Sequence, residues 1–172
     1  DVVGKAGVLR PEGEGLGNKF LSHIREVDAI VQVVRAFKDD NVIHVTNRVN
    51  PNEDASVINL ELILADMQTV SKSLNNVKKG AKGSAAKGAE KEIKTLEKIL
   101  SQLESEKPAR DLDFDDDEIK TVRDLHLLTM KPMLYVVNVD EYTPGMEVPQ
   151  IGQNSAKQIA ICAKLEAELA EL

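Results

Sequence analysis

The sequence contains no tryptophan and only one cysteine, and aromatic residues make up 3% of its 172 residues. One cysteine cannot form a disulfide within the chain, and no Cys/His cluster has zinc-site spacing, so a reducing compartment such as the cytoplasm is expected. So few aromatic side chains argue against a surface on which single-stranded nucleic acid stacks its bases. The core must be mainly aliphatic.

Long hydrophobic runs are also missing, since no stretch reaches the roughly 18 apolar residues of a membrane helix. The first residues, DVVGK, lack the layout of a signal peptide, so we expect no membrane association. The chain begins with Asp1 rather than Met, which suggests that it is part of a longer protein.

Positive charge is in the minority, with 22 Lys and Arg against 29 Asp and Glu and a net charge of -7. The chain as a whole therefore repels phosphate backbones, which argues against DNA binding and leaves only a local basic patch for RNA. Apolar residues, at 42%, suffice for a globular core. The length predicts one domain, or one domain with an insertion.

Three short apolar runs predict strands of a parallel sheet covered on both faces. They lie at 29–34, 133–137 and 158–161. Ligands of open α/β sheets bind at the carboxyl ends of the strands, so the loops beginning at Arg35, Asn138 and Cys162 are expected to share one crevice. A helix at 18–26, after a flexible glycine-rich loop at 13–17, is expected before the first strand. The predicted fold class is α/β, as part of a doubly wound domain.

Between the first two predicted strands, apolar residues recur at alternating spacings of three and four, which is typical of a coiled-coil seam. The positions are Leu60, Ile63, Met67, Val70, Leu74 and Val77 in one arm, and Ile93, Leu96, Leu100 and Leu103 in the other. A Gly- and Lys-rich stretch at 80–88 joins the arms, so we predict an inserted antiparallel hairpin. Pro108 ends the second arm, and Asp115 with Glu118 predicts a capping box for a short helix that returns to the sheet.

Asn138 and Glu141 follow a buried strand, where an amide and a carboxylate three residues apart can hydrogen-bond a nucleotide base. An asparagine at a strand end is also common as turn chemistry alone. A second candidate is the turn Cys162-Ala163-Lys164, whose amides can meet a purine edge while the lysine stem covers the ring. A plain strand-to-helix turn is the alternative. The similar triplet at 155–157 precedes its strand, at the wrong end of the sheet.

Six segments together resemble the Obg-like ATPase family, also called YchF. They are 12–21 (EGEGLGNKFL), 24–30 (IREVDAI), 40–45 (DNVIHV), 57–62 (VINLEL), 128–132 (LTMKP) and 166–172 (EAELAEL). The resemblance extends over nearly the whole chain. It implies a P-loop NTPase of the translation-factor class, with a helical hairpin inserted in its G domain and a ubiquitin-like TGS domain after it.

On this resemblance, residues 1–54 are G domain, 55–107 are the coiled-coil hairpin, and 108–172 are G domain again, with the TGS domain absent after Leu172. The sequence contains no Gly-x-x-x-x-Gly-Lys-Ser/Thr, so the phosphate cradle, its lysine and the magnesium-binding hydroxyl are missing. These residues alone are therefore not expected to hydrolyse ATP. The connection between Glu141 and Cys162 is also shorter than in the family.

The resemblance also assigns roles to individual residues. Asn138 to Glu141 match the base-recognition turn, with Val139 against the adenine, and the glutamate in the final place implies ATP rather than GTP. His44 matches a water-positioning histidine, although by pattern alone it is an ordinary surface strand position. The family implies Mg²⁺ with ATP. The expected γ-phosphate-sensing switch comprises Asp1, which also supports the magnesium indirectly, and Gly4, Gly13, Gly15 and Gly17.

Lysines concentrate around the predicted hairpin tip, at Lys72, Lys78, Lys79, Lys82, Lys87, Lys91 and Lys94. They can meet ribosomal RNA phosphates, or they can be the solvated end of a hairpin. The resemblance implies a ribosome partner and leaves both interpretations open. Two functions are therefore considered: a ribosome-associated ATPase, and a non-catalytic module that binds a ribosome or a protein through the hairpin.

Overall fold

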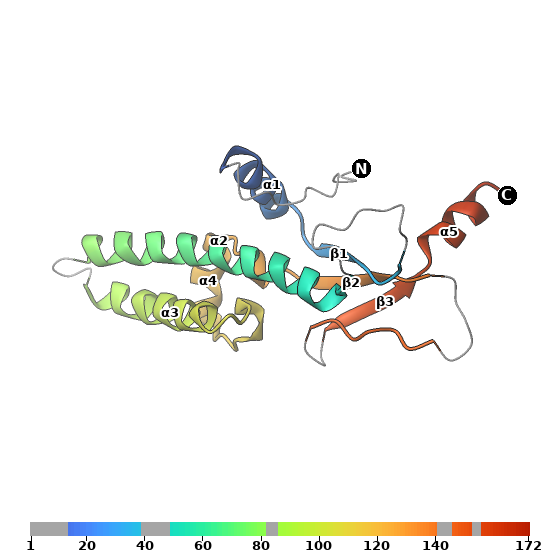
Figure 1. The fold of residues 1–172 in the computed structure, drawn as a ribbon. Coiled ribbons are helices and arrows are strands. Elements are labelled where there is room, and N and C mark those ends of the chain that lie inside the picture. Colours follow the sequence, from blue (N-terminus) through green and yellow to red (C-terminus); the bar gives the residue numbers. More distant parts are fainter. Residues whose placement is uncertain (1–13, 39–48, 82–85, 141–145, 153–155) are drawn as a thin grey trace. The chain divides into compact units, whose positions relative to one another are not determined.

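The structure is a computed structural model and describes residues 14–38, 49–81, 86–140, 146–152 and 156–172 (Figure 1). The elements are α1 (Glu14–Glu26), β1 (Ile30–Arg35), α2 (Pro51–Gly80), α3 (Ala86–Glu104), η2 (Ala109–Asp111), α4 (Asp116–Leu125), η3 (Leu128–Met130), β2 (Met133–Asn138), β3 (Lys157–Ile161) and α5 (Ala163–Ala170). They form two compact units, one made of Asp1–His23, Ile30–Val57 and Met133–Leu172, the other of Ile24–Ala29 and Ile58–Pro132. We call these the sheet unit and the hairpin unit.

The sheet unit contains a three-stranded parallel sheet in the order β1-β2-β3. The three predicted strands are thus confirmed, with ends shifted by no more than one residue. One face packs on a cluster of buried side chains: Val34, Ala55, Tyr135, Val137, Val139 and Ile151. On the other face, Val31 and Val33 are exposed, so the described residues cover only one face of β1. Within the described residues, β1 is therefore not covered on both faces, although the sequence predicted that it would be.

The helix before the sheet differs from the prediction at its start. The glycine-rich residues 13–17 are predicted to form a flexible loop, but α1 begins at Glu14 and includes Gly15 and Gly17. A Cβ built on Gly17 would have no heavy atom within 4 Å. No close contact requires a glycine there, so its entropic cost in the helix, about 0.5–1 kcal/mol relative to alanine, is not offset by packing.

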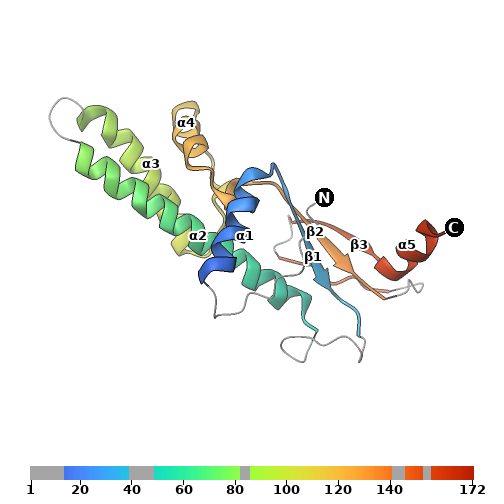
Figure 2. The ribbon, with the colours of Figure 1, turned by 90° about the horizontal axis from the view of Figure 1, so that it is seen from above.

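In the hairpin unit, α2 and α3 lie side by side and antiparallel (Figures 1 and 2). Nine of the ten predicted seam residues belong to its apolar cluster, either buried or packed against it. Leu60 does not, because it is 40% exposed. The physical reason is length: α2 has 30 residues and α3 has 19, so the first turns of α2 have no opposing helix. Ile99, absent from the predicted seam, is fully buried.

A buried carboxylate joins the middle of α2 to the turn before β2. Asp66 is fully buried. Its Oδ1 accepts a hydrogen bond from the Leu128 amide at 2.9 Å, and its Oδ2 accepts from the amide and hydroxyl of Thr129, both at 2.7 Å. The Thr129 hydroxyl in turn accepts from the Ala109 amide in η2 at 3.2 Å. One side chain therefore fixes α2, η2 and η3 together.

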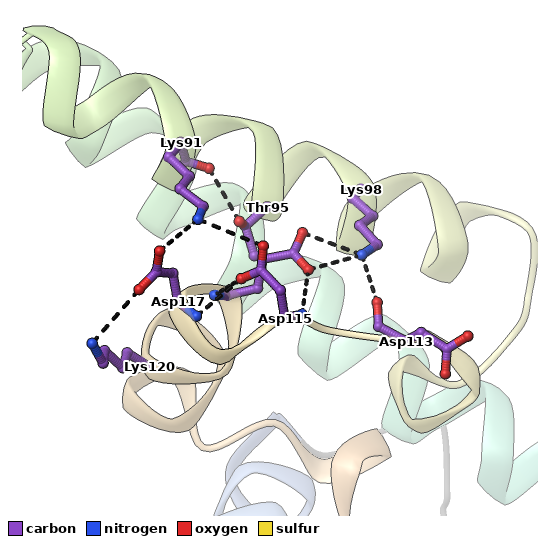
Figure 3. Close-up of polar contacts among 8 residues, drawn as sticks. Lys91, Thr95, Lys98, Asp113, Asp115, Asp117 and Lys120 are labelled. Atoms are coloured by element: carbon purple, nitrogen blue, oxygen red, sulfur yellow. Dashed lines mark hydrogen bonds and ion pairs between the residues drawn. The ribbon is translucent and has the colours of Figure 1, made fainter.

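The predicted capping box of α4 is confirmed. The Asp115 side chain accepts from the amides of Asp117 and Glu118, and the Glu118 side chain accepts from the Asp115 amide. The bond from the Glu118 amide is the main reason that the pKa of Asp115 is lowered. Lysines of α3 bind the same turn, with Lys91 at 2.7 Å from Asp117 and Lys98 at 2.6 Å from the Asp113 carbonyl (Figure 3). The cap thus also holds α4 against α3.

Replacing Asp66 by alanine should strongly destabilise the hairpin unit. The amides of Leu128 and Thr129 and the Thr129 hydroxyl would lose their acceptor in a buried place, and each such loss costs about 1–3 kcal/mol. We expect the free energy of unfolding, measured by urea titration of the helical circular dichroism signal, to fall by about 3–5 kcal/mol. The exposed Glu104 on α3 is the control, and Glu104→Ala should change stability by less than about 0.5 kcal/mol. Equal effects of the two substitutions would contradict the assigned role.

Asp66 should also make stability depend on pH. Burial raises the pKa of its carboxyl above the ordinary value of 3.8, although the bonds from Thr129 and Leu128 and the charge of Arg25 act the other way. Because the carboxyl binds its proton more tightly in the folded state than in the unfolded state, protonation stabilises the fold. This stabilisation is fully present below pH 3.8 and is lost as the pH rises through the raised pKa of Asp66. Urea unfolding from pH 4 to 7 should therefore show wild type losing stability relative to Asp66→Asn. Parallel curves would show that the carboxyl does not titrate in this range.

Candidate functional site

The carboxyl ends of the three strands lie next to one another in the sheet unit. In the strand register, Arg35 of β1 is level with Asn138 of β2, and Asn138 with Ile161 of β3. The ladder continues one residue further, because the Ala36 amide donates to the Asn138 carbonyl and the Val139 amide to the Ile161 carbonyl, both at 2.8 Å. The loops predicted to share one edge therefore begin from adjacent, hydrogen-bonded positions.

The Asn138 side chain joins the two predicted base-recognition elements. Its Oδ1 accepts a hydrogen bond from the amide of Ala163 at 3.1 Å. Ala163 is the first residue of α5, and Cys162 before it provides no side-chain cap. Asn138 thus satisfies one of the amides that a helix start leaves without a partner. This bond does not use the Asn138 Nδ2 group, which is a hydrogen-bond donor.

Two of the candidate residues, Val139 and Cys162, are buried at the base of the loops. Val139 is 2% exposed and packs in the cluster under the sheet, and Cys162 is 3% exposed. The buried Val139 side chain offers little surface to a base, so a contact there would involve its backbone. Ala163 and Lys164 are exposed beside them. The accessible chemistry of the edge is therefore an amide side chain, backbone groups of the turn and a lysine stem.

Arg35 and Phe37 add a feature that the sequence analysis missed. The Arg35 guanidinium lies 4.5 Å from the centroid of the Phe37 ring, and its Nε donates to the Phe37 carbonyl at 3.0 Å. A cation and an aromatic face, stacked on each other, thus follow β1 at the same edge as Asn138. The signal in the sequence was an aromatic two residues after an arginine at a strand end, which is not distinctive without the sheet register.

The other predicted site residues are not brought to this edge in the described part of the chain. Gly15 and Gly17 lie in α1. Lys157 of the rejected triplet is the first residue of β3, which agrees with its assignment to the opposite end of the strand. The remaining candidates lie outside the described residues: Asp1, Gly4, Gly13, His44 and Glu141.

Among the described residues, no three His, Cys, Asp or Glu side chains come together as metal ligands. The single expected ligand of a magnesium ion, Asp1, lies outside the described residues. Within the described part of the chain, no helix is long and apolar enough to cross a membrane.

No family model matches the sequence. The similar proteins found by comparison carry the same or related names. The chain is 50% identical over 180 residues to the ribosome-binding ATPase YchF of Bacillus subtilis, covering 97% of this chain and 48% of that protein. It is 43% identical over 180 residues to the protein of the same name from Escherichia coli O157:H7, covering 100% and 49%. The chain therefore spans about half the length of these relatives.

A relative with a different name and a solved structure agree. Obg-like ATPase 1 of Schizosaccharomyces pombe is 43% identical over 134 residues, which cover 75% of this chain and 34% of that protein. The structure of the Schizosaccharomyces pombe YchF GTPase superposes with a TM-score of 0.75 at 34% identity, covering 95% of this chain and 47% of that one. This match confirms the predicted fold class, part of an α/β G domain with an inserted helical part.

The Asn138 side chain should control the order of the α5 start. Asn138→Ala removes the acceptor of the Ala163 amide, so hydrogen exchange of that amide, followed by NMR, should accelerate by about fivefold, as expected for a bond of about 1 kcal/mol. Asn138→Asp retains an acceptor oxygen and is the matched control, in which protection should persist. Equal protection of Ala163 in wild type and Asn138→Ala would show that the bond does not order the turn.

Proposed function

Because the chain belongs to the Obg-like ATPase family, also called YchF, we propose that it supplies the base-binding edge and the helical hairpin of a nucleoside triphosphatase that hydrolyses ATP. The full-length protein acts on the ribosome, in the cytoplasm. The names of the bacterial relatives, ribosome-binding ATPases, support the partner and the class of activity. The Gly-x-x-x-x-Gly-Lys-Ser/Thr motif that binds the phosphates does not occur in these 172 residues.

The observation that carries the proposal is the hydrogen bond between Asn138 and Ala163. A base-recognition site needs donors and acceptors held in fixed positions by a rigid frame, because buried polar groups discriminate between bases only when they cannot rearrange. Here the two turns are tied to each other and to the ends of β2 and β3. In this proposal the Asn138 Nδ2 group donates to the base, and the amides after Cys162 contact its edge.

The choice of nucleotide rests on the family pattern at the end of the base-recognition turn. In relatives that bind guanine, an aspartate in this turn reads the base, and this chain has Glu141 in that place. We assign ATP as the preferred nucleotide on this basis, with GTP as the competing ligand. The names of the relatives include both ATPase and GTPase, so a direct comparison of the two nucleotides is required.

Hydrolysis is assigned to His44, which would orient the attacking water as a general base or hydrogen-bond acceptor. Gly15 and Gly17 support a switch that is ordered by the γ-phosphate. Helix-interior glycines lower the free energy needed to unwind the start of α1, which suits a segment that changes conformation with the bound nucleotide. Magnesium would accompany ATP, with Asp1 as an indirect ligand.

The alternative function, binding through the hairpin alone, receives less support from the described lysines. Three of those near the tip are paired with carboxylates: Lys78 with Glu97 at 2.7 Å, Lys91 with Asp117 at 2.7 Å, and Lys94 with Glu90 at 2.9 Å. Lys72 and Lys79 are exposed on α2. Pairing reduces the positive potential available to RNA. Among the described lysines near the tip, Lys72 and Lys79 are therefore the better candidates for a contact with RNA.

Steady-state kinetics of the full-length protein that carries this sequence test the proposal. We expect ATP to bind more tightly than GTP and to be hydrolysed, and His44→Ala to lower kcat by about 100-fold or more while the ATP dissociation constant changes less than about threefold. The exposed His23 is the control, and His23→Ala should leave turnover unchanged. Undiminished hydrolysis in His44→Ala would remove His44 from the mechanism. Absence of ATP binding in wild type would refute the proposed function itself.

A further inference from the structure

In the sequence between the two candidate base-binding turns, residues 146–152 belong to the sheet unit and form neither a helix nor a strand. We call these residues the strap. Its apolar side chains, Met146, Val148 and Ile151, pack in the buried cluster of the sheet unit, and Ile151 is fully buried. The same cluster contains Val139 of the base-recognition turn. The strap and that turn therefore share one core.

Gln158 of β3 binds the backbone of the strap with both ends of its side-chain amide. A segment without regular structure must find other partners for its backbone groups. The Gln158 Oε1 accepts a hydrogen bond from the Ile151 amide at 2.8 Å, and its Nε2 donates to the Pro149 carbonyl at 3.3 Å. Each end of the side chain thus meets a group of matching polarity. Both bonds are partly buried, so their loss would leave the strap poorly satisfied.

Asn52, in the first turn of α2, binds the strap in the same way from a different element. Its Oδ1 accepts from the Gly152 amide at 3.1 Å, and its Nδ2 donates to the Gln150 carbonyl at 2.9 Å. These two bonds are exposed, so water competes with them more than with the bonds of Gln158. Each of the four successive residues from Pro149 to Gly152 is therefore bonded to one of two amide side chains.

The anchor matters because β3 is an edge strand among the described residues, where it pairs with β2 alone. Gln158 lies on this strand, five residues before Ala163. The Ala163 amide donates to the Asn138 side chain at 3.1 Å. Hydrogen bonds tolerate only a few tenths of an ångström, so a displacement of β3 along β2 would break this bond. The position of β3 thus decides whether the two candidate base-binding turns meet.

A purely structural fastening is the simpler explanation, and two observations favour more than that. The apolar side chains of the strap already bury it against the cluster, but apolar contacts are not directional and set no exact position. The hydrogen bonds of Gln158 are directional, and both go to backbone groups, so they fix where the strap lies along β3. The strand that they fix is also the one that ends at the candidate base contact.

We propose that Gln158 is a positioning residue for base recognition, which fixes β3 to the strap and so holds the turn after Cys162 where it meets Asn138. Asn52 assists by fixing the same strap to the start of α2. The inference rests on the proposed function for the presence of a base at this edge and adds the residues that keep the edge in place. A rigid edge binds the base with a smaller ordering cost. Gln158 acts through β3 and does not itself contact the nucleotide.

Ligand binding by the full-length protein that carries this sequence tests the inference. Gln158→Met removes both hydrogen bonds and keeps the length of the side chain. We expect it to raise the dissociation constant for ATP about tenfold, while that for inorganic triphosphate, which has no base, changes less than about twofold. Hydrogen exchange of the Ala163 amide should accelerate in the same variant. Asn52→Ala should have the same effects in smaller measure, and Glu147→Ala, which alters an exposed side chain of the strap, is the matched control and should behave as wild type.

The outcomes separate the inference from its premise. Unchanged ATP affinity in Gln158→Met would overturn the role of Gln158, and so would an unaltered exchange rate of the Ala163 amide. A merely structural defect would weaken the binding of ATP and inorganic triphosphate by the same factor, which would also overturn it. Failure of the wild-type protein to bind ATP at all would instead refute the proposed function, and the inference with it.

Discussion

Asp66 accepts hydrogen bonds from three groups at a position that water does not reach, and the hairpin unit is organised around it. A buried carboxylate is costly unless its oxygens are occupied, and here each donor comes from the turn at Leu128 and Thr129. Satisfying the carboxylate therefore fixes that turn. Through the Thr129 hydroxyl it also fixes Ala109, where the chain returns from α3.

The polar contacts of the hairpin unit divide into two groups with different consequences. The contacts between α3 and α4, from Lys91 and Lys98 to the capping box, are exposed or only partly buried, and such pairs contribute little individually. The contacts around Asp66 are buried, so their geometry is tightly constrained. Arg25 lies between these extremes, because it is partly exposed but bonded to groups at the edge of the buried network.

In the sheet unit, the ends of the strands are held by hydrogen bonds at the sheet edge rather than by a buried carboxylate. The strand ladder extends beyond the carboxyl ends through the amides of Ala36 and Val139, and the Asn138 side chain ties in the start of α5. Buried side chains such as Val139 hold the loops from beneath. The groups left facing outward are therefore positioned by backbone bonds, which is what recognition of a flat, polar nucleotide base demands. The candidate base-binding edge and the hairpin are thus each preorganised within their own unit.

The sequence by itself determined the elements whose signals are local: three strands from short aliphatic runs, the hairpin from its heptad spacing, and the Asp115–Glu118 cap from residues three apart. It also identified Asn138 and the turn after Cys162 as candidates, because both follow strands. Only the tertiary structure decided which residues meet. The pairing of Asp66 with Thr129 spans 63 positions and that of Arg25 with Thr69 spans 44, and neither leaves a periodic pattern. The exposure of Leu60 was likewise settled by which neighbours α2 finds, since burial depends on the partner and not on the residue alone.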